Sequence, residues 1–272
     1  MDGVSFWKMS GSGNDFIIID NRTLFIDKTD FRNIVAKLCK RSMSVGADGL
    51  ILIEPSKQVD FKWDFYNSDG STAEMCGNGS RCAARFCYEN GIAGKQMKFE
   101  SLAGIIEAEI TGSSSVKVKL TRPSDLKLDI EIPLTDLTLN GSFVNTGVPH
   151  IAIEVEDIDN FDIKKYGREI RFHKLFSPTG TNVNFYKILP NKTVKIRTYE
   201  RGVEDETLAC GTGSAAVAFI LHKKSILKTP VELITSGGMK LIIHIDDNEK
   251  IYLEGEARLV YKGTLTEEAY KY

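Results

Sequence analysis

The sequence lacks three features: a long hydrophobic run, an excess of one charge, and a basic and apolar leader at its N-terminal end. Its longest apolar stretch, residues 215–221, is far too short to cross a bilayer. Lysine and arginine number 35, and aspartate and glutamate 37, so the chain has no electrostatic footprint for nucleic acid or an anionic membrane. Five cysteines, an odd number, in 272 residues argue against a secreted disulfide framework. We therefore expect a cytoplasmic protein with reduced thiols and with neither a nucleic-acid nor a membrane partner.

Proline is also scarce, with 7 residues against 23 glycines, and no low-complexity linker interrupts the chain. Most of the sequence consists of short apolar or alternating runs, a pattern typical of β-strands. The string Gly112-Ser113-Ser114-Ser115 lies between two of these runs and predicts a hairpin turn. The expected strands are residues 15–20, 49–53, 60–66, 104–110, 116–120, 150–155, 183–189, 193–199, 231–235, 240–245 and 250–253.

Four helices of two kinds are expected. Residues 29–40 carry apolar side chains at helical spacing behind a polar N-cap, and residues 162–172 repeat this amphipathic pattern more weakly. Residues 77–90 and 211–224 each follow a Cys-Gly-x-Gly-Ser string. The last helix is apolar on nearly all sides, which is typical of a helix buried inside a protein.

The order of these elements repeats within the chain. Each half predicts a strand, an amphipathic helix, further strands and then a cysteine string, and Cys76 and Cys210 mark equivalent points of the two halves. Two similar halves that face each other form one pseudo-symmetric cleft. We therefore expect an α+β fold of two pseudo-symmetric domains, each a curved, mostly antiparallel sheet around a buried central helix, with the active site in the cleft between them.

Cys76 and Cys210 are the residues that carry the chemistry. Each stands directly before a Gly-x-Gly that opens a helix, where the first-turn amides have no internal partner and attract anions. The same field is expected to lower the thiol pKa from about 8.5 toward neutrality. If the two thiols lie on opposite faces of one α-carbon, one thiolate removes its proton and the other thiol returns a proton from the far side. This pattern indicates a two-base racemase or epimerase.

The remaining cysteines have a structural interpretation. Cys39, Cys82 and Cys87 fall within apolar helical patterns, as buried small hydrophobic residues do. No histidine or cysteine cluster has zinc spacing, and no lysine motif argues for pyridoxal phosphate. We therefore expect neither a metal nor an organic cofactor.

The polar residues near the two strings suit a small zwitterion, which makes an amino acid the expected small-molecule substrate. Glu200 and Arg201 lie just upstream of Cys210. The Glu200 carboxylate could bind an ammonium group, and the Arg201 guanidinium could bind a carboxylate with two hydrogen bonds. His150 lies in a Gly-Val-Pro loop that enters a strand. Asn14 and Asn182 occupy loop-to-strand junctions, and Asn67 holds the corresponding place ahead of Cys76.

These strings together resemble the bacterial diaminopimelate epimerase family. KMSGSGNDF, VGADGL, FYNSDGSTAEMCGNGSRCAARF, NTGVPH, GTNVNF and ERGVEDETLACGTGSAAV occur in that family's order and span nearly the whole chain. The resemblance implies a cofactor-independent isomerase that interconverts LL- and meso-2,6-diaminopimelate in lysine and peptidoglycan biosynthesis. It also implies a first domain of residues 1–119 plus 257–272 and a second of residues 120–256, and it suggests a homodimer.

The resemblance also implies roles for individual residues. Cys76 and Cys210 would be the two bases, and Glu200 and His150 would support catalysis. The reacting carboxylate would meet the two helix N-termini, at Gly77, Asn78, Gly211 and Thr212. The other substrate contacts would come from Asn14, Asn67, Asn182, Glu200 and Arg201.

Two positions depart from the better-known bacterial pattern. Gly49 replaces a glutamine, and Val148 replaces an asparagine two residues before His150. Both lost amides would have been substrate contacts or close neighbours of them. We therefore expect weaker discrimination at the distal amino-acid end, unless another contact compensates.

Three alternatives remain open from the sequence. The nearest is a racemase of the same fold that acts on proline, hydroxyproline or histidine, which a substrate panel distinguishes. A thiol–disulfide enzyme would use the paired cysteines, but the chain has no Cys-x-x-Cys motif and such an enzyme would reduce insulin. A non-catalytic binding domain would keep its full function after Cys76→Ala.

Overall fold

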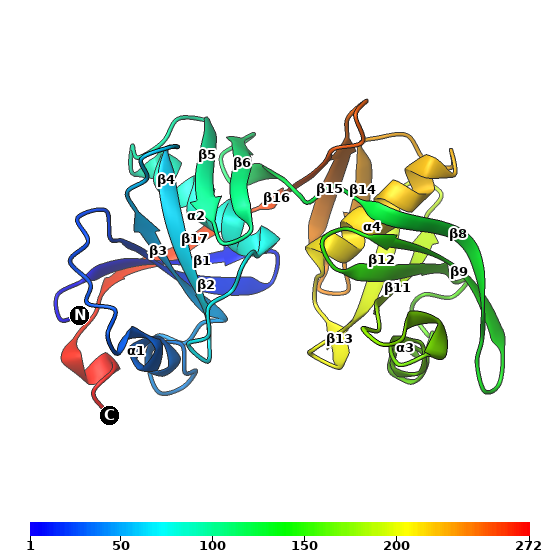
Figure 1. Cartoon of the computed structure of the whole chain (residues 1–272), viewed down its shortest axis with the longest axis horizontal. Coiled ribbons are helices and arrows are strands. Elements are labelled where there is room, and N and C mark those ends of the chain that lie inside the picture. Colours follow the sequence, from blue (N-terminus) through cyan, green and yellow to red (C-terminus); the bar gives the residue numbers. More distant parts are fainter. The chain divides into compact units, whose positions relative to one another are not determined.

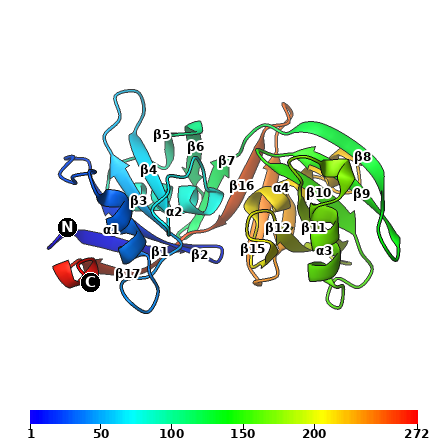
Figure 2. The same cartoon turned by 60° about the horizontal axis from the view of Figure 1, so that its bottom comes forward.

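The computed structural model describes all 272 residues, which form two compact units. The first unit comprises Met1–Val118 with Gly255–Tyr272, and the second comprises Lys119–Glu254. Figure 1 labels the elements of both, and Figure 2 shows them from a second direction. No helix is long and apolar enough to cross a membrane.

The first unit combines a mixed sheet with two helices and a short 3-10 helix. Its strands are β1 (Ser5–Gly11), β2 (Asn14–Asp20), β3 (Gly49–Glu54), β4 (Phe61–Asn67), β5 (Gln96–Ser101), β6 (Gly104–Ile110), β7 (Ser115–Lys119) and β17 (Arg258–Thr264). Its helices are α1 (Phe31–Leu38), α2 (Gly77–Glu89) and η2 (Glu267–Ala269). The antiparallel pair β6–β7 confirms the hairpin expected at the serine-rich turn.

The second unit also combines a mixed sheet with two helices and a short 3-10 helix, and it has one strand more. Its strands are β8 (Ser124–Pro133), β9 (Thr138–Asn145), β10 (Pro149–Glu154), β11 (Asn182–Ile188), β12 (Val194–Glu200), β13 (Asp205–Thr207), β14 (Val231–Ile234), β15 (Lys240–Ile245) and β16 (Ile251–Glu256). Its helices are α3 (Ile163–Arg171), η1 (Lys174–Phe176) and α4 (Gly211–Lys223).

The order of parallel and antiparallel strand pairs along the chain is the same in both units. In the first, β1–β2 is antiparallel, β2–β3 parallel across α1, β3–β4 antiparallel, β4–β5 parallel across α2 and β5–β6 antiparallel. In the second, β9–β10, β10–β11, β11–β12, β12–β14 and β14–β15 repeat these five relations around α3 and α4. Most pairs are antiparallel, so the expected α+β fold with two pseudo-symmetric halves is confirmed.

The central helix of each unit is α2 or α4, and both are buried. In α4 the side chains from Ala215 to Leu221 are all at most 3% exposed, as an apolar helix requires. Helix α2 packs on β1, β2, β3 and β6, and α4 packs on β9, β10, β11 and β15. Each helix begins directly after its cysteine, so Cys76 and Cys210 each lie at the N-terminus of a buried helix.

The amphipathic helices α1 and α3 cover the other side of their units. Phe31, Val35 and Leu38 of α1 are buried in one apolar cluster. Ile163 and Ile170 of α3 enter a second cluster in the other unit. The burial of each helix face stabilises its unit, because it removes apolar surface from water.

Candidate active site

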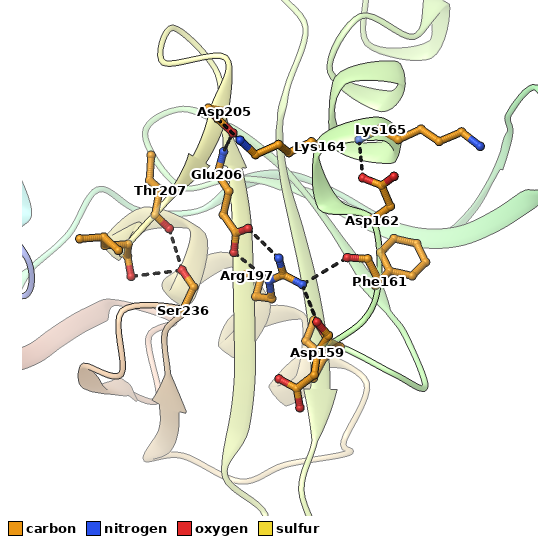
Figure 3. Close-up of polar contacts among 12 residues, drawn as sticks. Asp159, Phe161, Asp162, Lys164, Lys165, Arg197, Asp205, Glu206, Thr207 and Ser236 are labelled. Carbon is orange, nitrogen blue, oxygen red and sulfur yellow. Dashed lines mark hydrogen bonds and ion pairs between the residues drawn. The ribbon is translucent and has the colours of Figure 1, made fainter.

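The hairpin β12–β13 carries Glu200 and Arg201, and a partly buried ion pair fixes it. The Arg197 guanidinium donates to both carboxylate oxygens of Glu206, at 2.8 and 2.7 Å, and to the carbonyl oxygens of Asp159 and Phe161 in the loop before α3 (Figure 3). These contacts join the hairpin to the α3 loop. Glu206 of the acidic run 204–206 thus lies on strand β13 and is paired with Arg197.

Glu200 ends strand β12 with its carboxylate turned toward the neighbouring strand. Thr207 donates its hydroxyl to Glu200 Oε2 at 2.9 Å. Ser236 donates to the Thr207 carbonyl at 2.8 Å (Figure 3). Burial raises the pKa of the Glu200 carboxyl, and the Thr207 hydrogen bond opposes this rise. A buried carboxyl with a raised pKa is suited to bind an ammonium group or to exchange a proton.

Asn182 links the two loops that carry the other polar residues. Its side-chain oxygen accepts from the Arg201 backbone N–H at 2.8 Å, and its amide nitrogen donates to the Pro149 carbonyl at 2.9 Å. The residue is buried. Its amide therefore holds Arg201 beside the strand that starts with Pro149 and His150.

His150 is buried and neutral. Burial, with a further contribution from the Arg201 charge, lowers its pKa to about 3. Asn184 donates from Nδ2 to the Ile151 carbonyl at 3.0 Å, while its oxygen accepts from Thr198 at 3.0 Å, so the amide orientation is fixed. The same Nδ2 lies 3.2 Å from His150 Nδ1. His150 Nδ1 is therefore the acceptor, and the proton lies on Nε2, which has no partner within the protein.

Asn184 was missed from the sequence. It shares one face of β11 with Asn182, since residues two apart on a strand point to the same side. The alternation in the string GTNVNF was therefore a usable signal. The oxygen of Asn184 also lies against α4: a Cβ added at Gly213 would be only 2.2 Å from it and 3.3 Å from Cys210 Sγ. This close approach requires glycine at position 213.

Cys210 is the N-cap of α4, with its Sγ 3.5 Å from the Thr212 hydroxyl. Burial and the nearby Glu200 charge raise its pKa to about 12, although the Thr212 hydroxyl and the first-turn amides of Thr212 and Gly213 oppose the rise. The expectation that the helix N-terminus makes this thiol acidic is therefore wrong. Cys210 is a neutral thiol at pH 7, which is the form that donates a proton.

In the first unit, Cys76 is the N-cap of α2 and its sulfur accepts from the Gly79 backbone N–H at 3.4 Å. A chain of amides lies close to it. Asn78 donates to the Asn14 side-chain oxygen at 2.7 Å, and Asn14 donates to Asp48 Oδ2 at 3.0 Å. The sequence-predicted residues Asn14 and Asn78 are thus brought together at the start of the helix.

Asn67 and Gly49 form a backbone pair where β3 meets β4. A Cβ at Gly49 would lie 2.6 Å from both the Phe65 ring and the Tyr66 carbonyl. The departure from glutamine noted in the sequence therefore has a steric reason, because β4 occupies the space of a side chain. Asn67 itself donates to the Ser71 hydroxyl at 3.0 Å.

The expected site residues are thus divided between the units. The first holds Asn14, Asn67, Cys76, Gly77 and Asn78; the second holds His150, Asn182, Glu200, Arg201, Cys210, Gly211 and Thr212. No group of three or more His, Cys, Asp or Glu side chains is placed to hold a metal ion.

Comparison with known proteins gives a consistent result. The family model described as diaminopimelate epimerase matches residues 6–125 and 142–260, one segment in each half. The chain belongs to the diaminopimelate epimerase family. The diaminopimelate epimerase of Aquifex aeolicus is 47% identical over 99% of this chain and 100% of its own length. That of Archaeoglobus fulgidus is 40% identical over 96% of each chain.

Solved structures outside the diaminopimelate epimerase family share the fold. A PhzF-family phenazine biosynthesis protein of Bacillus anthracis superposes with a TM-score of 0.73 at 14% identity, over 97% of this chain and 99% of its own. A probable proline racemase of Agrobacterium radiobacter gives 0.70 at 13%, over 96% and 92%. At such low identity these structures show the two-domain fold alone.

Proposed function

We propose that this chain is an amino-acid epimerase that interconverts LL- and meso-2,6-diaminopimelate without a cofactor. The observation that carries the proposal is the repeated placement of a cysteine as the N-cap of a buried helix, at equivalent points of two units with the same strand order. Membership of the diaminopimelate epimerase family supports the substrate.

In the proposed mechanism the two units contribute one thiol each to a single α-carbon. A Cys76 thiolate takes the α-proton and becomes a thiol, which leaves a carbanion on the substrate. The Cys210 thiol gives its proton to the opposite face and becomes a thiolate, so the centre is inverted and the charge has moved between the cysteines. The reverse direction exchanges the roles.

The reacting carboxylate is proposed to lie at the first-turn amides of the two helices, at Gly77, Asn78, Gly211 and Thr212. Amides aimed at an oxygen on which charge develops stabilise the transition state more than the ground state. The remaining contacts are assigned by charge. Arg201 binds a carboxylate, the Glu200 carboxylate binds an ammonium group, and the side chains of Asn14, Asn67, Asn182 and His150 complete the hydrogen bonds.

Conversion of LL- to meso-diaminopimelate, measured by chiral separation, tests this proposal. We expect turnover by the native chain, its near-complete loss in Cys76→Ala and Cys210→Ala, and its retention in Cys87→Ala, which alters a buried thiol of α2. No turnover of diaminopimelate, with turnover of proline, hydroxyproline or histidine, would instead support the related racemase.

The same set of amino-acid substrates tests how selectively the enzyme recognises the amino-acid end of diaminopimelate that does not react. Because Gly49 and Val148 provide no side-chain amide, we expect measurable α-proton exchange with single-headed amino acids such as lysine. A strong preference for diaminopimelate over all of them would contradict this expectation.

We also propose a cytoplasmic location, on the balanced charge and the odd number of cysteines, and a homodimeric assembly, on the resemblance to the family alone. Light scattering after size-exclusion chromatography tests the assembly, and a mass near 30.3 kDa would contradict it.

A further inference from the structure

Arg81, on the second turn of α2, is a buried cation that has no carboxylate partner. Its side chain is 0% exposed. The guanidinium donates to the Ser12 hydroxyl and the Asn78 side-chain oxygen at 2.7 Å each, and more weakly to the carbonyls of Gly77 and Glu256. All four acceptors are neutral. They satisfy hydrogen-bond donors of the Arg81 guanidinium but do not balance its positive charge.

A charge in this position is costly. Burial lowers the pKa of the Arg81 guanidinium, yet arginine stays protonated in proteins, so the cation persists at a loss of hydration. A buried charge is ordinarily paired with a charge of opposite sign, so an anion is expected close to Arg81. The question is therefore which nearby group becomes negative.

Two thiols lie close to the Arg81 charge. Cys82 is the next residue in the chain, and Cys76 directly precedes Gly77 and Asn78, which both accept hydrogen bonds from the guanidinium. Cys82 is fully buried, and burial raises its pKa to about 12, so it stays neutral. Cys76 is partly exposed at the start of the helix. The attraction between a Cys76 thiolate and the cation is mutual, because it favours the charged form of both partners.

We propose that Arg81 is the cation that stabilises the thiolate of Cys76, and that the resting enzyme carries its negative charge on Cys76 and its proton on Cys210. This inference rests on the proposed function. It assigns Arg81 as a positioning residue, which acts through Cys76, and it makes the two thiols unequal despite the symmetry of the fold.

The second unit lacks this cation. The position five residues after Cys210 is Ala215, whereas the position five residues after Cys76 is Arg81. The charged neighbour of Cys210 is the Glu200 carboxylate, which opposes a thiolate. The asymmetry between the two helices therefore favours the thiolate at Cys76 and the thiol at Cys210.

Arg81 also orients the amides beside Cys76. An arginine only donates, so Asn78 must turn its oxygen toward the guanidinium and its nitrogen toward Asn14. The Asn14 nitrogen then points to Asp48. Both amide orientations near the thiolate are consequently fixed by the buried cation.

The other charged groups on elements that pack against this end of α2 are already paired. Lys8 of β1 forms an ion pair with Asp15 of β2, and Arg41 pairs with both Asp15 and Asp48. Arg81 is thus the uncompensated charge within this part of the first unit.

The test is the rate of iodoacetamide alkylation at each cysteine as a function of pH, resolved by peptide mass spectrometry. In the native chain at pH 7 we expect Cys76 to react at least about tenfold faster than Cys210, since one pKa unit changes the thiolate fraction tenfold. Arg81→Gln should move the Cys76 midpoint to higher pH and slow its alkylation at pH 7 about tenfold. Arg81→Lys, which keeps the charge, should restore most of the rate.

Arg85→Gln is the matched control. Arg85 lies one turn further along α2 but donates to the Glu89 carboxylate at 3.5 Å and to the Ala257 carbonyl at 2.5 Å, so its charge is compensated. Its removal should leave the Cys76 profile unchanged. An unchanged Cys76 profile in folded Arg81→Gln would overturn the proposal.

If Arg81→Gln does not fold, the native chain decides the question, since equal rates or a faster Cys210 would overturn the proposal. Epimerase activity is measured on the same samples. A native chain that shows the alkylation asymmetry but converts no diaminopimelate would refute the proposed function and leave the charge assignment intact.

Discussion

Lowering the pH from 7 to 5 should destabilise the second unit through His150. The folded protein holds this imidazole neutral, with a pKa of about 3, whereas an unfolded chain protonates it near 6.5. Below pH 6.5 the unfolded state therefore binds a proton that the folded state rejects. Stability due to this residue is full above pH 6.5 and is lost as the pH falls toward 3.

The two pKa values set the magnitude. For one group titrating at 6.5 when unfolded and about 3 when folded, linkage gives a loss of about 2 kcal/mol between pH 7 and pH 5. The neutral state has a structural cause, because Asn184 places a donor opposite His150 Nδ1 and no carboxylate contacts the ring. Protonation of His150 would place an N–H on Nδ1 against the N–H of Asn184 and would add a positive charge to a buried site.

The assay must observe the second unit by itself. The two tryptophans, Trp7 and Trp63, belong to the first unit, so their fluorescence does not report on β10. Urea denaturation read by pulsed hydrogen exchange of peptides from β10 and β11 supplies the free energy of unfolding at pH 7, 6 and 5. His150→Gln should show a pH dependence smaller by about 2 kcal/mol over this range.

The control is His222→Gln, which removes a partly exposed histidine from the last turn of α4 and leaves the His150 surroundings intact. It should follow the native pH dependence. The reasoning is refuted if native protein and His150→Gln lose stability in parallel between pH 7 and pH 5.

Three further substitutions test the local geometry. Gly213→Ala places a Cβ 2.2 Å from the Asn184 oxygen, so we expect epimerase kcat to fall at least about tenfold while circular dichroism is kept; native kinetics would argue against this contact. Gly49→Gln forces a side chain against the Phe65 ring, so it should lower the free energy of unfolding, measured in urea, by about 1–3 kcal/mol and should not lower KM. A lower KM would show that a side chain at this position can contact substrate. Arg197→Met removes the ion pair with Glu206 that holds the β12–β13 hairpin, so it should raise KM and lower Tm by a few degrees. A change in Tm without a change in KM would mean that this ion pair is not needed to position Glu200 and Arg201.

Local sequence patterns predicted the elements that hold the cysteines. The apolar run of α4 and the Cys-Gly-x-Gly strings placed both central helices within one residue of their observed ends. Strands β8 and β9 were missed. Residues 126–132 of β8 alternate apolar and polar side chains, so the strand signal was present and was overlooked, although β8 is largely exposed and bulged. Strand β1 was also missed, although it pairs with β2 across a tight turn.

The chemistry of the site was only partly readable. Cysteine positions follow from the repeat, but the protonation state of Cys210 depends on burial and on Glu200, which are tertiary effects. Arg81 was overlooked because a charged residue in a helix is ordinarily assigned to a solvated face. Its burial results from the packing of α2 on neighbouring strands, which no local pattern encodes.

Proton NMR and mass spectrometry of LL-diaminopimelate turnover in deuterated water test the two-thiol mechanism most directly. A thiol carries one solvent-exchanged proton, so the account predicts that meso product formed at early times contains one deuterium at the inverted carbon while the remaining LL substrate is unlabelled. Cys76→Ser and Cys210→Ser should each lose this conversion. Early product that retains the substrate's own protium, or full activity in either variant, would contradict the two-thiol account.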